Sequence, residues 1–350
     1  MLIRILTCVC FSITVVFADW QTNLKNKIKR NDFPSWMIEQ IREELSFCAH
    51  SVSEQDLYRV LERFPELGFL LCNIENNQLS WTYYPNDSAV IDSRADMFIA
   101  GIKTLLKVTP LPNMKFLVHT GEAFCEKTTI PILTWCKHNE WSRNALSIPD
   151  YEAISGNTNY LFEVVKGSHL YPWNAKKKIG FWRGGTTGGF GYEFMPRVKV
   201  ILESLKYPNL LDARFTGIYP GQEGLYPQTF FGSSLSVSNH LKYKYQILID
   251  GHVSAFSRFY WQLFSGCLTF KHDSCWYQWF YRELKPYVHY VPYHADASNL
   301  IEQINWAISH DQEAYVIAQN ALHFATQNLT HENVMLYLYL ALIEYARLMR

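Results

Sequence analysis

The stretch that decides the fold is KYKYQILIDGHVSAFSRFYWQLFSGCLTF, which runs from Lys242 to Phe270. Its apolar segment Tyr245–Asp250 predicts a buried strand that ends at an Asp-Gly pair. The aromatic-rich segment Arg258–Phe264 predicts a helix, which Gly266 would end. Cys267–Phe270 then predicts a second strand. A strand, a helix and a strand in this order indicate parallel pairing.

The same alternation continues on both sides of this stretch. Expected strands are Ile179–Arg183, Leu211–Phe215 and Tyr287–Pro292, and expected helices are Pro196–Leu205, Trp276–Leu284, Ser298–His310 and Gln312–Gln327. The N-terminal half predicts helices within Asp32–Arg63 and Arg94–Val108, strands within Phe69–Tyr84, and short buried strands at Lys115–His119 and Ile130–Cys136. The alternating part predicts a parallel sheet covered on both faces.

We expect an α/β protein of two Rossmann-like domains with a cleft between them. The composition shifts to Gly, Asn, Ser and Pro between Asp150 and Lys178, which suggests a domain junction there. The expected domains are residues 19–165, with the C-terminal helix 332–350 packing back on them, and residues 166–331. Residues 1–18 predict a signal peptide, because Arg4 precedes an apolar run that ends with small residues at Val16 and Ala18.

The charge balance excludes one class of function. Lys plus Arg and Asp plus Glu both number 32, so the net charge is zero. The chain has no overall basic field with which to wrap nucleic acid. Inferences about function therefore depend on individual polar motifs.

Two arginines follow expected strands. Arg183 enters the glycine-rich loop Trp182–Gly189, whose backbone N–H groups can approach an anion closely. The alternative is an ordinary turn. Arg258 begins an expected helix after a loop of small residues. It is either a surface charge or a group that binds a diphosphate.

Several acidic side chains follow strands or turns. Glu122 follows the expected strand Lys115–His119 and a glycine, where a carboxylate could act as a general base or simply be solvated. Asp150 and Tyr151 could bind a sugar hydroxyl and stack on a sugar ring, or form a turn. Asp273 lies in a polar loop after a strand and carries the same two alternatives.

Metal-binding patterns are missing from the sequence. There is no Asp-x-Asp triplet of the kind that holds a divalent ion on a diphosphate. There is no HExxH motif, and no Cys-x-x-Cys pair outside the expected signal peptide. We expect no metal and no cofactor.

Motifs along most of the chain resemble those of the capsule-associated-protein glycosyltransferases of family 90, which include the Rumi-type protein O-glucosyltransferases and lipopolysaccharide-modifying enzymes. The segments that carry the resemblance are, in order, KFLVHTGE (115–122), IPILTWCK (130–137), IPDY (148–151), KKKIGFWRGGTTG (176–188), KYKYQILIDG (242–251), SAFSRF (254–259), LFSGCLTFKHDS (263–274) and WFYRELKPYVHYVP (279–292).

The resemblance implies a metal-independent, inverting transferase of the GT-B type. Such an enzyme would move glucose or xylose from a UDP-sugar to a hydroxyl of a protein or glycan. Residues 19–165 would then be the acceptor-side domain, and residues 166–331 would bind the UDP-sugar. Glu122 would be the base, at the position where the animal enzymes carry an Asp.

The resemblance also assigns the donor contacts. Arg183 and Arg258 would bind the diphosphate, with Gly184, Thr186 and Ser257 nearby. The expected partners are a UDP-sugar and a protein or glycan acceptor, without nucleic acid and without a membrane span after signal cleavage. The expected location is the ER lumen or secretory pathway in a eukaryote, and the periplasm or exterior in a bacterium. The alternative function is a non-catalytic sugar- or protein-binding module derived from the family.

Overall fold

The structure is a computed structural model that describes residues 19–85, 92–188 and 195–349. The predicted signal peptide at residues 1–18 lies outside these ranges, as does the segment that follows the glycine-rich loop. The chain divides into two compact units. Unit 1 comprises residues 1–157, 275–281 and 328–350, and unit 2 comprises residues 158–274 and 282–327.

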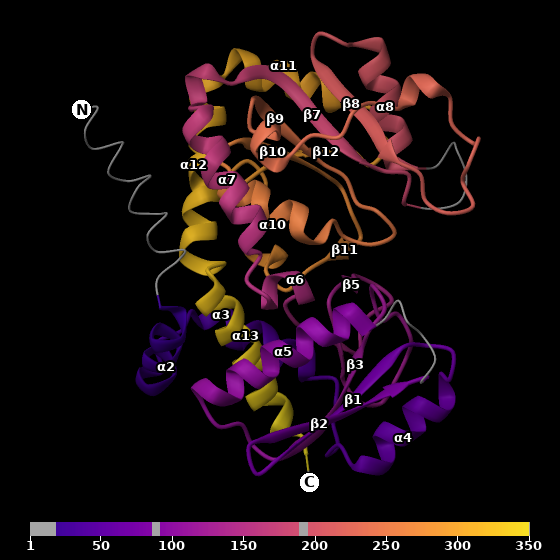
Figure 1. Ribbon diagram of the computed structural model, residues 1–350, viewed down its shortest axis with the longest axis vertical. Helices are drawn as coiled ribbons and strands as arrows, with labels where there is room; N and C mark the ends of the chain where they lie inside the picture. Colours follow the sequence, from indigo (N-terminus) through magenta and orange to yellow (C-terminus); the bar gives the residue numbers. More distant parts are fainter. Residues whose placement is uncertain (1–18, 86–91, 189–194, 350) are drawn as a thin grey trace. The chain divides into compact units, whose positions relative to one another are not determined.

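Unit 1 is built on a five-stranded mixed sheet with the order β2-β1-β3-β4-β6 (Figure 1). Its strands are β1 (Phe69–Glu75), β2 (Gln78–Tyr84), β3 (Met114–His119), β4 (Ile132–Thr134) and β6 (Ala145–Ser147). The β1–β2 and β1–β3 pairs are antiparallel, whereas β3–β4 and β4–β6 are parallel. The β1–β2 turn places Asn76 and Asn77 at positive φ, a conformation that Asn tolerates well.

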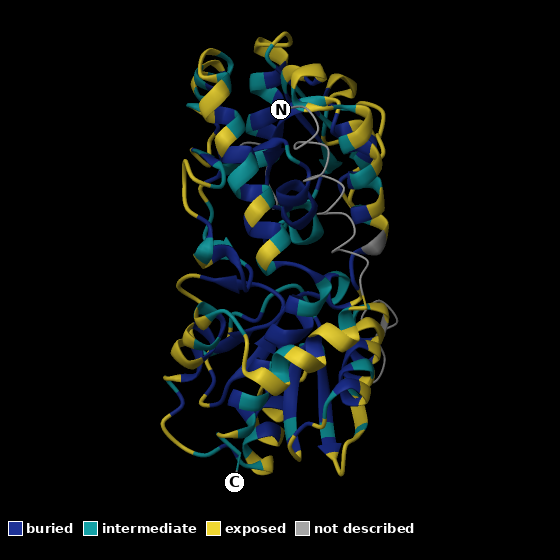
Figure 2. Ribbon diagram, turned by 90° about the vertical axis from the view of Figure 1, so that its left-hand side faces the viewer, coloured by how far each residue is buried: buried dark blue, intermediate teal, exposed yellow. Residues whose placement is uncertain are grey.

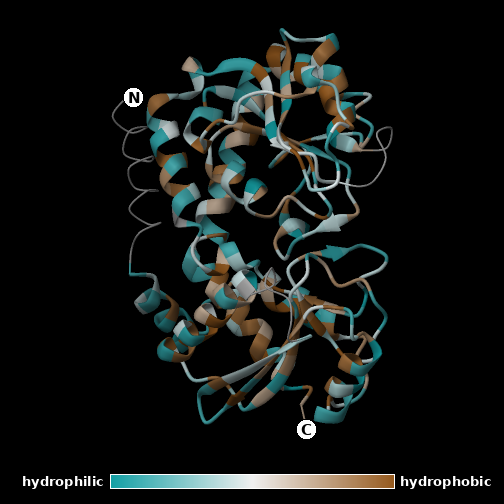
Figure 3. Cartoon of the chain, turned by 45° about the vertical axis from the view of Figure 1, so that its right-hand side comes forward, coloured by the Kyte–Doolittle hydropathy of each residue, from teal (hydrophilic) through white to brown (hydrophobic). Residues whose placement is uncertain are grey.

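Helices cover both faces of this sheet. They are α2 (Trp20–Arg30), α3 (Ser35–Leu45), α4 (Glu54–Arg63), α5 (Asp92–Val108), α6 (Tyr151–Ile154) and α13 (His331–Ala346). Leu57 and Leu61 of α4 pack with Phe69 of β1 on one face. On the other face Phe116 of β3 meets Tyr345 of α13 edge-on. Figure 2 shows the central strands as mostly buried, and Figure 3 shows hydrophobic positions on both strands and helices.

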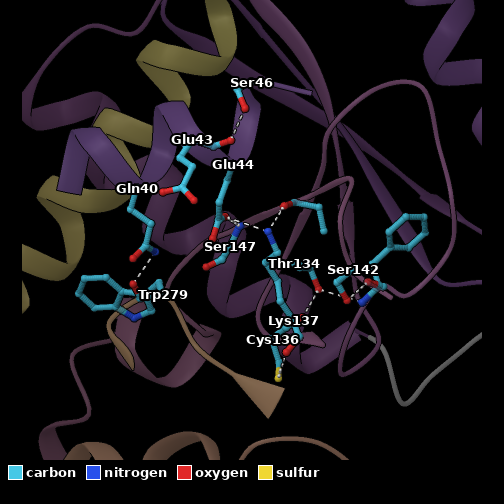
Figure 4. A network of polar contacts seen from close by, with 12 residues as sticks. Gln40, Glu43, Glu44, Ser46, Thr134, Cys136, Lys137, Ser142, Ser147 and Trp279 are labelled. Carbon is cyan, nitrogen blue, oxygen red and sulfur yellow. Dashed lines mark hydrogen bonds and ion pairs between the residues drawn. The ribbon is translucent and has the colours of Figure 1, made fainter. Parts of the chain in front are cut away.

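A buried polar network joins α3 to the loops of the sheet in unit 1 (Figure 4). Lys137 Nζ lies 3.4 Å from Glu44 Oε2, and both side chains are about 95% buried. Lys137 also donates to the carbonyl of Ala145, and Glu44 accepts the N–H of Ser147. Gln40 donates to the carbonyl of Trp279, which holds the segment 275–281 in unit 1.

Unit 2 is built on a five-stranded sheet with the order β12-β10-β9-β7-β8, in which every pair is parallel. Its strands are β7 (Lys177–Gly185), β8 (Leu211–Gly217), β9 (Tyr243–Leu248), β10 (Leu268–His272) and β12 (Val291–Tyr293). Its α-helices are α7 (Thr158–Leu170), α8 (Pro196–Lys206), α9 (Val237–His240), α10 (Phe256–Phe264), α11 (Leu300–Ser309) and α12 (Asp311–Asn328). Single 3-10 turns lie at Trp173–Ala175, Gln228–Phe230 and Tyr281–Glu283.

The core of unit 2 explains why its strands are nearly uniform in hydrophobicity. Ile247 of β9 and Phe270 of β10 are fully buried with Ile201 of α8 and Ile304 of α11. On the other face α10 packs against α7, which in turn packs against α9. Strands covered on both faces need apolar residues on both sides.

The structure confirms the α/β class with two sheets, and it differs from the predictions in three details. The sheet of unit 1 is mixed, because the β1–β2 hairpin adds antiparallel strands. The unit boundary falls after Asn157, ahead of the predicted 165, because α7 packs on α9 and α10. The predicted helix Trp276–Leu284 is wrong. Its first residues form β11 (Trp276–Tyr277), which pairs with β5 (Lys137–His138), and a 3-10 turn follows.

The buried Glu44–Lys137 pair generates a stability prediction. Lys137→Met leaves the Glu44 carboxylate buried without this cation, and we expect a loss of about 3–5 kcal/mol in the free energy of unfolding. Urea denaturation followed by tryptophan fluorescence measures it.

The matched control is Lys115→Met, which breaks the exposed pair of Lys115 with Glu54. It should cost less than about 1 kcal/mol. Combining Lys137→Met with Glu44→Leu should recover most of the loss, since no uncompensated charge is left. Equal losses for the two single lysine variants would contradict the prediction.

Candidate functional site

The order of the strands in unit 2 defines where a ligand site is expected. In chain order the strands are first to fifth as β7, β8, β9, β10 and β12, so the spatial order is 2-1-3-4-5. The direction of winding reverses between β7 and β9. In open parallel sheets, ligands bind outside the carboxyl ends of the strands at this reversal. Arg183 ends β7, and Arg258 follows β9 in α10, so both flank it.

Arg258 is a cation without a carboxylate partner among the described residues. It lies half-buried in the first turn of α10 (Figure 1), and its Nη2 donates to the carbonyl of Arg183 over 2.7 Å. Burial lowers the pKa of Arg258 to about 10, which still leaves the guanidinium protonated near neutral pH. An uncompensated, partly desolvated positive charge favours an anionic ligand.

The amino terminus of α10 adds donors beside Arg258. Ala255 precedes the helix and provides no side-chain cap. Phe256 N–H bonds to Ser254, and Phe259 N–H bonds to Ala255, which leaves the amides of Ser257 and Arg258 without backbone acceptors in the described part of the chain. Such amides and the helix dipole attract anions. The Ser257 side chain is half-buried in this turn.

Arg183 is engaged differently from Arg258. Its Nη2 donates to Asp212 over 2.9 Å, and its other nitrogens donate to carbonyls of Trp182, Asp212 and Ser233. The side chain is only 12% exposed. The structure thus brings its main-chain carbonyl to Arg258, whereas its charge is neutralised by Asp212. A diphosphate contact by the Arg183 guanidinium stays a prediction.

Gly184 and Thr186 shape the loop after β7. A Cβ on Gly184 would lie 2.5 Å from the indole of Trp182, so this position requires glycine for close approach. Thr186 is buried, and its hydroxyl accepts the N–H of Tyr219 over 2.8 Å. Its hydroxyl therefore holds the loop after β8. The loop beyond Gly188 lies outside the described residues.

Arg197 is a site residue that sequence reasoning missed. It lies in the first turn of α8, and it donates to the carbonyls of Gly185 over 2.8 Å and Asp250 over 2.9 Å. It thereby joins the loops after β7 and β9. The sequence feature that could have identified Arg197 is its position directly after Pro196, at the start of a helix that follows a glycine-rich loop.

Buried polar atoms of His240 and of the loop between β9 and α10 lack hydrogen-bond partners among the described residues. They are Nδ1 of His240, Nε2 of His252 and Oγ of Ser254. Burial, together with the charges of Arg258 and Arg183, lowers the pKa of His240 to about 3. Buried groups of this kind are normally paired with protein, water or ligand.

Asp273 has a peripheral position. It is exposed after β10, and its N–H donates to the carbonyl of Tyr293 over 2.8 Å. This bond holds the loop to β12. The structure gives its carboxylate no ion pair with another described residue, and a sugar contact stays a prediction.

In unit 1, Arg94 brings Glu122 and Tyr151 together. Glu122 follows β3 and is 34% exposed, and its Oε1 lies 3.4 Å from Nη2 of Arg94. The Arg94 guanidinium also lies 5.4 Å from the ring centroid of Tyr151. Burial raises the pKa of Tyr151 to about 12. Arg94 was not among the predicted site residues, because only the tertiary structure places α5 beside the end of β3.

Asp150 is the N-cap of α6. Its Oδ1 accepts the N–H groups of Glu152 and Ala153 over 3.0 and 3.1 Å. The residue is 1% exposed. Burial raises the pKa of its carboxyl to about 7, although the two hydrogen bonds by themselves lower that pKa. Its observed contacts are those of a helix cap, and a sugar contact stays a prediction.

The described residues hold neither a metal-binding cluster nor a helix that could span a membrane. Residues 19–85, 92–188 and 195–349 contain no group of three or more His, Cys, Asp or Glu side chains arranged to hold a metal ion. Over the same ranges, no helix is long and apolar enough to cross a membrane.

Comparison with known families matches residues 38–350 to glycosyl transferase family 90. The chain therefore belongs to glycosyl transferase family 90, which confirms the family predicted from its motifs.

Named relatives are similar over much of the chain. Protein O-glucosyltransferase 2 of Danio rerio is 30% identical over 324 residues, which are 88% of this chain and 62% of the relative. Protein O-glucosyltransferase 3 of Homo sapiens is 31% identical over 69% of this chain and 48% of its own length. Protein O-glucosyltransferase 1 of Homo sapiens is 27% identical, over 68% and 63%. The chain thus spans about half to three fifths of the length of these relatives.

One solved structure has a weak overall similarity to the chain. The crystal structure of Anabaena Alr3699/HepE in complex with UDP and glucose aligns with a TM-score of 0.40 and 11% identity. The alignment covers 71% of this chain and 79% of that one.

The raised pKa of Asp150 predicts a pH-dependent stability. A carboxyl with a folded-state pKa near 7, against 3.8 ordinarily, favours folding most at acid pH, and this contribution is lost as pH rises to about 7. Asp150→Asn keeps the cap oxygen and cannot ionise. Its stability relative to the unsubstituted chain should rise by roughly 2–4 kcal/mol between about pH 4 and pH 8.

Asp56→Asn is a control whose effect on stability should change with pH in the opposite direction. Hydrogen bonds from Ser53 hold the pKa of Asp56 below its ordinary value, so the charged form stabilises the fold above that value. Its replacement should cost stability at neutral pH and little in acid. Thermal unfolding from about pH 2 to pH 8 measures both variants, since the contribution of Asp56 is lost only below its ordinary pKa of 3.8. A pH-independent Asp150→Asn difference would contradict the assignment.

Proposed function

We propose that this chain is a metal-independent, inverting glycosyltransferase that moves glucose or xylose from a UDP-sugar to a hydroxyl group of a protein or glycan. Membership in family 90 supports the class of reaction. Similarity to proteins named protein O-glucosyltransferases supports glucose as one donor sugar. The observation that carries the proposal is Arg258, a cation without a carboxylate partner in the described residues, at the winding reversal of a parallel sheet.

The donor half of the reaction needs stabilisation of a departing diphosphate. Arg258 supplies a fixed positive charge, and the amides of Ser257 and Arg258, which bond no backbone carbonyl of the described residues, supply aligned donors. Charge-assisted bonds of this kind strengthen as negative charge develops on the leaving group. The proposal of metal independence rests on the family resemblance and on the missing Asp-x-Asp triplet.

The acceptor half needs a base. In the proposed reaction the Glu122 carboxylate takes the proton of the acceptor hydroxyl. The acceptor oxygen then forms a bond to the anomeric carbon as the bond from that carbon to UDP breaks, which inverts the configuration. Glu122 suits this role because it is partly exposed after a strand end. Arg94 orients the carboxylate through one long contact, which leaves oxygen lone pairs for an acceptor.

A non-catalytic sugar- or protein-binding module is the alternative, and one observation favours it. The ion pair with Asp212 neutralises Arg183, one of the two arginines expected to bind the diphosphate. For the proposed transferase, export through the signal peptide would place the chain in the ER lumen or secretory pathway of a eukaryote, or in the periplasm or exterior of a bacterium.

Glu122→Gln tests the base. The amide cannot accept the proton, so transfer should fall by two orders of magnitude or more, as is typical for removal of a general base, which contributes about 10²–10⁴-fold. UDP binding by calorimetry should be unchanged. Glu126→Gln is the matched control, because Glu126 is an exposed glutamate of the same loop. Near-normal transfer by Glu122→Gln would exclude its role as base.

Arg258→Ala tests the donor site. Loss of a charge-assisted contact to the diphosphate should lower turnover by roughly 100-fold or more, and it should weaken UDP binding. Arg258→Lys keeps the charge without the planar fork and should recover part of the affinity. The assay is hydrolysis or transfer of UDP-glucose and UDP-xylose with EDTA present. No turnover and no UDP-induced thermal shift in the unsubstituted protein would favour the binding module.

A further inference from the structure

Asp250 is a buried carboxylate that the proposed reaction does not use. It follows β9 and is 5% exposed. Its Oδ1 accepts the N–H of Ala255 over 3.1 Å. Its Oδ2 accepts the hydroxyl of Ser274 and lies 3.2 Å from Nε2 of His272. Both oxygens are therefore engaged, by groups from the loop before α10 and from the end of β10.

The backbone of Asp250 is held as firmly as its side chain. Its N–H donates to Nε2 of His272 over 3.1 Å. Its carbonyl accepts from Nε of Arg197, which also donates to the carbonyl of Gly185 in the loop after β7. We call Asp250, His272, Ser274 and the N–H of Ala255 the Asp250 cluster. It joins the loops after β7, β9 and β10 at one edge of the sheet.

The charge of Asp250 is compensated. Burial opposes ionisation, but the neighbouring His272, Lys271 and Ser274 together hold the pKa of Asp250 below its ordinary value. Lys271 is itself partly desolvated, which lowers its pKa. A charged carboxylate accepts hydrogen bonds about twice as strong as a neutral group does. Asp250 can therefore hold the loop from Gly251 to Ala255 in one conformation.

That loop sets the position of Arg258. Ala255 is the residue before α10, and its carbonyl accepts the first helical bond, from Phe259. It provides no side-chain cap, so the carboxylate of Asp250 bonds the amide at the start of the helix instead. Arg258 lies in the turn that follows, with its amide and guanidinium directed by this start.

We propose that Asp250 is a positioning residue for the donor diphosphate, which it serves by holding the first turn of α10 and thus Arg258. This inference rests on the proposed function. It assigns Asp250 no contact with the substrate and no proton transfer. Its chemical consequence is preorganisation: the amides of α10 and the guanidinium of Arg258 are in place before UDP binds.

Asp311 provides the matched control for a merely structural role. It also pairs with buried or partly buried groups, accepting from Lys244 over 2.8 Å and from Trp173 Nε1 over 3.2 Å. Lys244 lies at the start of β9, so Asp311 lies at the amino-terminal edge of the same sheet. Asp311→Asn should therefore lower stability without changing the affinity for UDP.

The experiment measures UDP binding by calorimetry for the full chain, Asp250→Asn, Arg258→Ala and the double variant. An Asn side chain keeps one oxygen and replaces the other with an N–H₂ group, which would face a donor. Either the bond from Ala255 or the contacts with Ser274 and His272 are therefore lost. We expect Asp250→Asn to weaken UDP binding about tenfold. If Asp250 acts through Arg258, the double variant should bind no more weakly than Arg258→Ala alone.

Amide exchange of residues 255–259 without ligand provides a second measurement, and Asp250→Asn should speed it more than Asp311→Asn does. Thermal unfolding verifies that each variant is folded. Ser274→Ala retains the Ala255 bond and should weaken UDP binding less than Asp250→Asn. Unchanged UDP affinity in folded Asp250→Asn, or losses that add fully with Arg258→Ala, would overturn the inference. No UDP binding by the unsubstituted chain would instead overturn the proposed function, and with it the ligand named here.

Discussion

The parallel pairing of all five strands in unit 2 is the constraint on which the candidate donor site depends. Parallel strands end at one edge, so the loops after β7, β9 and β10 lie together although they are far apart in the chain. Arg183 lies near the end of β7, Asp250 lies in the loop after β9, and Arg258 lies in the first turn of α10. An antiparallel pair at this place would send alternate loops to opposite edges, and no common site would form.

At that edge of the sheet, two arginines with similar sequence surroundings differ in whether their charge is paired. Arg183 and Arg258 both follow strands near small residues. Asp212 on the neighbouring strand neutralises the first, whereas the second meets only a carbonyl among the described residues. A buried or partly buried cation without a counter-ion is costly unless a ligand supplies the negative charge. The donor role therefore rests more on Arg258 than on Arg183.

Unit 1 also contains a buried pair of opposite charges, and its role is structural. Glu44 and Lys137 are buried together and each also bonds one backbone group, and Gln40 holds the returning segment 275–281. Glu122 differs because it is partly exposed and has one long contact to Arg94. The buried pair contributes to the stability of the unit, while Glu122 keeps the exposure that its proposed role as base requires.

The sequence alone determined the α/β class, most strands and helices, and the family, because periodicity and motif spacing are local. It also placed Glu122 after a strand and Arg258 at the start of a helix. It missed the antiparallel pairing of β1 with β3, and it missed the place of Trp276–Tyr277, which pairs with β5 far back in the chain. Only the tertiary structure decided which side chains are paired. Arg183 with Asp212, Arg197 with Asp250 and Arg94 with Glu122 each join separate elements. Such contacts follow from packing, which no single segment encodes.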